Sequence, residues 1–165
     1  MICCDRAQSN LKFKKIENRL DGLEIDVRDG PKEPMMRKAL LSVFALVEMG
    51  AGLALVVSPP VLTTILFGTT PETPTALITG RIAGIALLSL VTACWIARND
   101  PASVAATGVV GGMLLYNLGV VVSLFYAGTC EGLVGVGLWP AVVTHALLAV
   151  WCVACLGSKR ISPAS

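Results

Sequence analysis

The stretch RIAGIALLSLVTACWIA, residues 81–97, decides the fold, because it places Arg81 at the head of a long run without another charge. With the residues just before it, it gives an apolar segment over 76–97, long enough to cross the ~30 Å hydrocarbon core of a bilayer as a helix. A charge in such a segment is costly without a partner. We therefore expect further membrane helices that bring polar groups to Arg81.

Three other apolar segments, at 39–57, 102–126 and 138–156, have a similar length. The composition agrees with them, since 55% of the residues are hydrophobic, only 15% are charged and the mean hydropathy is +0.74. The sequence therefore predicts an all-α integral membrane protein, a four-helix bundle with short loops whose outer face contacts the lipid bilayer.

Turn-forming residues separate these four spans. Ser58-Pro59-Pro60 ends the first span. Val61–Phe67 is too short to cross a membrane, so we expect an interfacial helical turn that Gly68 closes. Asn99-Asp100-Pro101 is a tight turn, which makes the second and third spans antiparallel neighbours. Pro140 falls in the first turn of the fourth span, where its missing N–H costs nothing.

Most of the 13 Lys/Arg and 11 Asp/Glu residues lie before the first span. The sequence predicts a polar tail over residues 1–34. This tail is disordered, or it lies upstream of the real start of translation at Met35 or Met36. A short surface helix over 11–23 is an alternative. Residues 35–157 form the membrane domain, and residues 158–165 form a short second tail. No clustered basic face is present, so nucleic-acid binding is not expected.

The basic residues near the span ends predict the orientation. Five fall on one side of the predicted bundle: Arg37, Lys38, Arg98, Lys159 and Arg160. Only Arg81 leans to the other side. We therefore expect both termini in the cytoplasm and a multi-pass protein of the inner (plasma) membrane. A cleaved signal peptide over the first span is the competing interpretation, and Glu48 within that span argues against it.

Each span carries one charged, amide or imidazole side chain, and the four lie at a similar depth. Counted at ~1.5 Å per residue from the outer helix ends, the four lie roughly 9–15 Å below the outer boundary. They are Glu48, Arg81, Asn117 and His145. We expect Glu48 and Arg81 to neutralise each other on adjacent helices, because an unpaired buried charge is unstable. Asn117 and His145 would satisfy the remaining donors and acceptors, and Tyr116 is a further candidate lining residue.

Two interpretations of this polar layer stay open. It is a structural clasp, since membrane bundles use interhelical polar contacts as glue. Alternatively it is a site for a proton, an ion or a small polar headgroup such as that of a quinone, because His145 can change charge near neutral pH. The sequence assigns no catalytic residue. It favours a structural or small-molecule-handling component, with a partner subunit or a second copy as its protein partner, over an enzyme. His145 is the single histidine, so no metal site is predicted.

The motif Cys152-Val153-Ala154-Cys155 raises the alternative of a quinone- or thiol-linked membrane oxidoreductase, or a subunit of one. The predicted topology opposes it, because this pair and Cys94 lie at the cytoplasmic end, where thiols stay reduced. Such an enzyme needs a second pair on the outer side, and only Cys130 is there. We expect these cysteines to pack as small apolar residues.

Glycines predict where helices approach closely. Gly80 and Gly84 in the second span, and Gly108 and Gly112 in the third, each place two small residues one turn apart. We expect both pairs to lie at contacts between helices.

Several segments together resemble a family of small, uncharacterised bacterial membrane proteins. They are EMGAGL at 48–53, RIAGIALL at 81–88, Tyr116-Asn117, and LWPA at 138–141 with His145. This family is loosely similar to the DoxX-like proteins, and the resemblance covers residues 36–156. It implies a four-helix bundle in the inner membrane. It implies little chemistry, because DoxX-like proteins include some associated with quinol oxidation and many with no assigned role.

Overall fold

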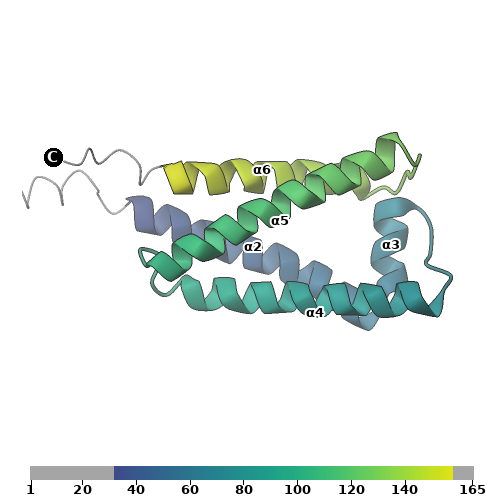
Figure 1. Cartoon of the computed structure of the whole chain (residues 1–165), viewed down its shortest axis with the longest axis horizontal. Coiled ribbons are helices and arrows are strands. Elements are labelled where there is room, and N and C mark those ends of the chain that lie inside the picture. Colours follow the sequence, from purple (N-terminus) through teal and green to yellow (C-terminus); the bar gives the residue numbers. More distant parts are fainter. Residues whose placement is uncertain (1–31, 158–165) are drawn as a thin grey trace, which may run out of the picture. The chain divides into compact units, whose positions relative to one another are not determined.

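The computed structural model describes residues 32–157, and within this range the chain forms five helices and no strand (Figure 1). The helices are α2 (Lys32–Val57), α3 (Pro59–Phe67), α4 (Pro74–Ala97), α5 (Val104–Thr129) and α6 (Leu138–Gly157). All except α3 are long and apolar enough to cross a membrane. The predicted all-α membrane bundle is confirmed. The predictions for residues 1–31 and 158–165 lie outside the described residues.

The helix ends follow local sequence signals. The side chain of Thr73 accepts a hydrogen bond from the Ala76 N–H (3.2 Å) at the start of α4, and Ser103 does the same for Ala106 (3.1 Å) at the start of α5. These caps satisfy backbone donors that have no partner within the helix. α2 begins at Lys32, earlier than the predicted span at 39, because Pro34 falls in its first turn and removes no helical hydrogen bond there.

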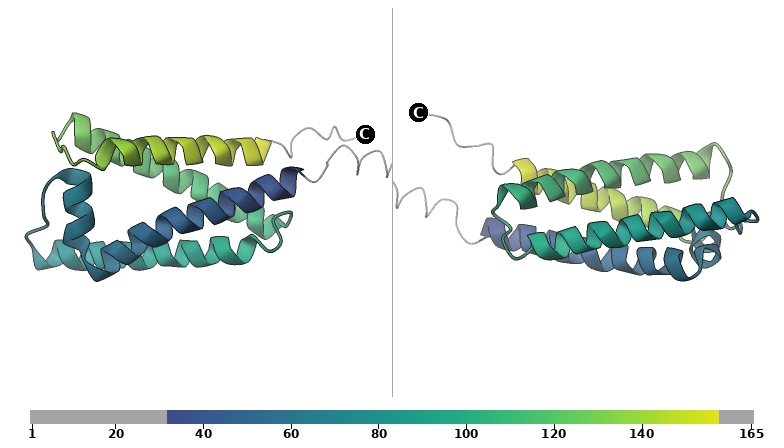
Figure 2. Two further views of the ribbon diagram at one scale, coloured as in Figure 1. Left: turned by 180° about the vertical axis from the view of Figure 1, so that it is seen from behind. Right: turned by 60° about the horizontal axis from the view of Figure 1, so that its bottom comes forward.

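The short helix α3 lies across the direction of the long helices (Figures 1 and 2). Pro59 and Pro60 occupy its first positions, and it ends at Gly68, whose φ of 73° is in the left-handed region that suits glycine. The Gly137 N–H donates to the Ile65 carbonyl oxygen (2.8 Å), which ties α3 to the loop before α6. The predicted turn after the first span is therefore a helix that joins α2 to the far side of the bundle.

The core of the membrane domain lies between the four long helices. Its buried members are Leu40, Leu41, Phe44, Ala45, Cys94, Val110, Met113, Leu148, Cys152 and Cys155. The cysteines among them have no exposed surface. Many large apolar side chains face outward instead, such as Ile82, Leu115 and Leu147. An apolar exterior of this kind suits contact with lipid.

One predicted glycine contact is present and the other is not. A Cβ added at Gly84 would lie 2.8 Å from the Gly52 carbonyl oxygen, so α2 and α4 touch backbone to backbone near the end where α3 lies (Figure 2). Gly80 packs similarly against Pro59. By contrast, a Cβ at Gly108 or Gly112 would meet nothing within 4 Å. The expectation that this second pair joins helices of the same chain is therefore wrong, because it faces away from the bundle.

Candidate functional site

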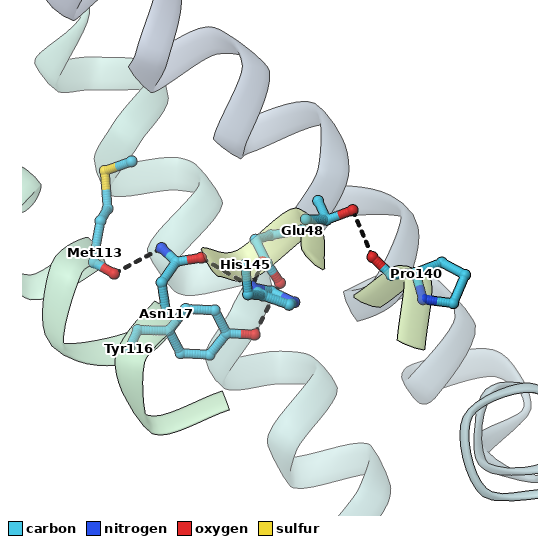
Figure 3. Close-up of polar contacts among 7 residues, drawn as sticks. Glu48, Met113, Tyr116, Asn117, Pro140 and His145 are labelled. Carbon is cyan, nitrogen blue, oxygen red and sulfur yellow. Dashed lines mark hydrogen bonds and ion pairs between the residues drawn. The ribbon is translucent and has the colours of Figure 1, made fainter. Parts of the chain in front are cut away.

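Four polar side chains from α2, α5 and α6 meet inside the bundle, as Figure 3 shows. They are Glu48, Tyr116, Asn117 and His145, which we call the polar cluster. Glu48 lies one turn after the buried Phe44, so both point into the core. Glu48 is 1% exposed and Asn117 is fully buried. The structure thus brings together three of the four residues predicted for the polar layer, with Tyr116 beside them.

The two carboxyl oxygens of Glu48 have different surroundings. The Tyr116 hydroxyl donates a hydrogen bond to Oε2 (2.9 Å). Oε1 is buried without a hydrogen-bond partner and lies 3.8 Å from His145 Nδ1. An unsatisfied buried acceptor costs about 1–3 kcal/mol. The site therefore holds a carboxyl group that is only half satisfied.

The Asn117 amide is fixed in one orientation. Its Nδ2 donates to the Met113 carbonyl oxygen (2.7 Å), and its Oδ1 lies 2.8 Å from His145 Nδ1 (Figure 3). Turning the amide over would set two acceptors against each other at Met113. Because an amide oxygen only accepts hydrogen bonds, Nδ1 of His145 carries the hydrogen. In the neutral ring, Nε2 is then a bare acceptor.

The Nε2 atom lies at the edge of the polar cluster. The polar contacts described for the ring involve Nδ1. Within residues 32–157, the buried side-chain nitrogen or oxygen atoms without a hydrogen bond are Glu48 Oε1 and Arg98 Nε, and Nε2 is not among them. The His145 side chain keeps 12% of its surface exposed. Its open edge is therefore the one opposite the Asn117 contact.

Ring packing fixes the positions of these groups. The ring of Tyr116 packs edge-to-face against Phe44 (centroids 5.9 Å apart, 87° between planes) and against His145 (5.8 Å, 74°). Such arrangements are favoured by the ring quadrupoles. The cluster is thus held by apolar packing on one side and hydrogen bonds on the other.

Arg81 lies outside the polar cluster, which corrects the predicted Glu48–Arg81 pair. Its side chain is exposed on α4, and no acidic group in the described part of the chain lies within ion-pair distance. The reason is the register of α4 against α2. Gly84 meets Gly52 and Gly80 meets Pro59, so Arg81 lies roughly 10 Å nearer than Glu48 to the end of the bundle at which α3 lies. Near the start of its helix, Arg81 can instead extend toward the lipid headgroups.

A second buried charge, Arg37, was expected only as an interface residue. It is 3% exposed and donates to three oxygens beyond its own helix. They are the carbonyl oxygens of Cys155 (3.0 Å from Nη2) and Pro101 (3.1 Å from Nη1) and Oγ1 of Thr107 (3.2 Å from Nη1). Cys155 lies in the last turn of α6, where carbonyls lack partners within the helix and cations are favoured. Nothing in the sequence predicts that Arg37 is buried while Lys38 beside it is exposed.

Neither a metal cluster nor a wide cavity marks the polar cluster. Among the described residues, no group of three or more His, Cys, Asp or Glu side chains could hold a metal ion. A shallow apolar pocket lies on α3, lined by Pro60, Val61, Thr64 and Ile65, and shares no residue with the cluster. The cluster reaches the surface of the bundle at the partly exposed side chains of His145 and Tyr116.

Comparison of the chain with models of known protein families, with curated proteins and with solved structures finds no match. The resemblance to DoxX-like proteins therefore stays a prediction, and the function is argued from the polar cluster itself.

Proposed function

We propose that this protein is a small-molecule-handling component of the bacterial inner membrane, in which Glu48 and His145 exchange a proton with a bound compound. The observation that carries the proposal is the isolation of Glu48. Its carboxyl group is buried, and within residues 32–157 the only basic side chain in ion-pair range is His145, at 3.8 Å. Ionisable residues at membrane depth are costly and mark proton or substrate sites.

A purely structural clasp explains this arrangement less well. A clasp requires hydrogen bonds, and a neutral amide in place of Glu48 would accept the Tyr116 hydrogen bond equally well. The carboxyl group adds the cost of an ionisable group and leaves Oε1 unsatisfied. Sequences keep such local conflicts chiefly at functional sites. This favours a role in which Glu48 changes its protonation or its partner.

The pair has a simple proton chemistry. With Nδ1–H fixed by Asn117, an ionised Glu48 and a neutral His145 ring with a bare Nε2 can together take up one proton. A compound with a hydroxyl group can transfer its proton to Nε2, so that an O–H bond breaks, an N–H bond forms and the compound leaves as an oxyanion. The imidazolium that results is stabilised by the Glu48 carboxylate.

A quinone headgroup is one compound that such a pair could serve, and a quinone-linked oxidoreductase remains the alternative function. A thiol-linked mechanism has less support, since Cys152 and Cys155 are fully buried in the core. Buried thiols in apolar surroundings are poor nucleophiles.

The test is infrared difference spectroscopy of the protein in lipid nanodiscs as the pH changes between about 5 and 8. The C=O band of a buried carboxyl should change with pH, disappear in Glu48→Gln, and change its pH dependence in His145→Gln. Tyr126→Phe, which alters a tyrosine outside the cluster, is the matched control. If the wild-type protein shows no Glu48 band that responds to pH, the cluster is a clasp and the proposal fails.

A further inference from the structure

We propose that His145 is the ligand-contacting residue of the cluster, and that its Nε2 accepts a hydrogen bond from the hydroxyl group of a lipophilic, uncharged compound such as a phenol. This inference rests on the proposed proton exchange and adds the atom, the tautomer and the class of ligand. It assigns positioning roles to Asn117 and Glu48.

The tautomer follows from a chain of three groups on α5 and α6. The Met113 carbonyl fixes the Asn117 amide, and the amide oxygen fixes the hydrogen on Nδ1 of His145. Glu48 Oε1, at 3.8 Å, lies on the same side of the ring and favours a hydrogen there too. The lone pair of Nε2 is therefore held outward, toward the exposed edge of the side chain. A ring free to exchange tautomers would offer that lone pair only part of the time.

The class of ligand follows from what this atom can recognise and where it lies. A bare ring nitrogen selects a donor, so the ligand must present an O–H or N–H group. His145 lies roughly 10 Å along α6 from Leu138, at membrane depth, so the remainder of the ligand must be apolar. The residues one turn away on the same face of α6 are all aliphatic: Ala141, Val142, Leu148 and Ala149. A weakly acidic hydroxyl can also give its proton to the imidazole, which an aliphatic amine cannot do.

The experiment uses the fact that His145 is the only histidine of the chain. Protein labelled with ¹⁵N-histidine and purified without a histidine tag gives ring-nitrogen signals from this residue alone. In nanodiscs we expect a protonated Nδ1 and a bare Nε2. Adding 4-butylphenol should move the Nε2 signal saturably in the direction of an accepted hydrogen bond, whereas 4-butylanisole, which has the same shape but no O–H, should not.

The variant that isolates the positioning role is Asn117→Leu. It should mix the two tautomers and weaken phenol binding by about tenfold, as the loss of one ordinary hydrogen bond implies. A wild-type spectrum with the hydrogen on Nε2, or equal responses to the phenol and the anisole, would overturn the inference. Because both measurements use the wild-type protein, they remain decisive if the variant does not fold. If the Glu48 infrared band still responds to pH, proton exchange stands and only the ligand assignment fails.

Discussion

At the scale of single residues, the two buried ionisable groups of α2 differ in how completely they are hydrogen-bonded. Arg37 is satisfied by carbonyl and hydroxyl oxygens at the end of the bundle where α6 ends. Glu48, about three turns further along, keeps an oxygen without a partner. A buried charged group whose hydrogen bonds are all formed stabilises the fold. A group with an unpartnered atom can still bind a proton or a ligand. We infer that Arg37 serves the fold and Glu48 serves the chemistry.

Replacing Arg37 with Met should therefore destabilise the membrane domain. The substitution removes hydrogen bonds from a charged donor to Cys155, Pro101 and Thr107. One hydrogen bond of this kind contributes about 1.5–3 kcal/mol to stability. We expect a loss of at least about 2 kcal/mol, measured by thermal unfolding in detergent. Lys38→Met, which removes the same charge from an exposed neighbour, is the control and should change stability little. Equal losses in the two variants would show that the charge matters and the hydrogen bonds do not.

At the scale of helices, glycine has two different uses in this protein. On α4, Gly84 lets the backbone of α2 approach within contact distance of Gly52. On α5, Gly108 and Gly112 meet nothing in their own chain. Small residues one turn apart thus permit a close contact without specifying one, and the packing of the other side chains decides where the contact forms.

Adding one methyl group at Gly84 and at Gly112, by substitution with alanine, measures how closely each glycine is packed. Gly84→Ala places a Cβ 2.8 Å from the Gly52 carbonyl oxygen and 2.9 Å from Leu55 Cβ, so α2 and α4 must separate. Overpacking of this kind costs about 1–3 kcal/mol. Gly112→Ala adds the same atom in open space and should be neutral or slightly stabilising, because alanine favours the helix. Denaturation of both variants in the same detergent tests this. A loss in Gly112→Ala as large as that in Gly84→Ala would show that the α5 face is covered in the membrane.

The sequence predicts where a residue lies along its own helix better than it predicts which residues of other helices it meets. Each residue advances a helix by ~1.5 Å, so the common depth of Glu48, Asn117 and His145 could be read directly. Rotation about the helix axis could not, because the lipid-facing and core-facing sides of these helices are equally apolar. Arg81 lies roughly 10 Å nearer the α3 end than Glu48, because Gly84 of α4 is level with Gly52 of α2. Tyr116, not Arg81, donates to Glu48.

At the scale of the whole membrane domain, orientation decides which compartment the polar cluster serves. Glu48 lies roughly 14 Å along α2 from Val57, and His145 roughly 10 Å along α6 from Leu138, so both are nearer the end of the bundle at which α3 lies. The basic residues gather at the opposite end, which the positive-inside rule places in the cytoplasm. The cluster should therefore exchange its proton and its ligand with the outer leaflet.

Cysteine labelling tests this orientation, and burial selects which thiols report it. Cys94, Cys152 and Cys155 are buried and should stay silent from either side, while Cys130 is exposed in the loop between α5 and α6. In a Cys3→Ser/Cys4→Ser variant, a membrane-impermeant maleimide added to cells whose outer membrane has been removed should label Cys130. The reaction should be as complete in cells with an intact inner membrane as in cells whose inner membrane has been permeabilised.

The opposite side is reported by a cysteine at the exposed Asn99, which lies in the turn between α4 and α5. Asn99→Cys, combined with Cys130→Ser and the two N-terminal serine substitutions, should react only after the membrane is permeabilised, because this turn follows a span that ends beside Arg98. Labelling of Asn99→Cys in intact cells, with Cys130 protected, would invert the domain. Glu48 and His145 would then lie nearer the cytoplasm, and their proton would be drawn from inside the cell.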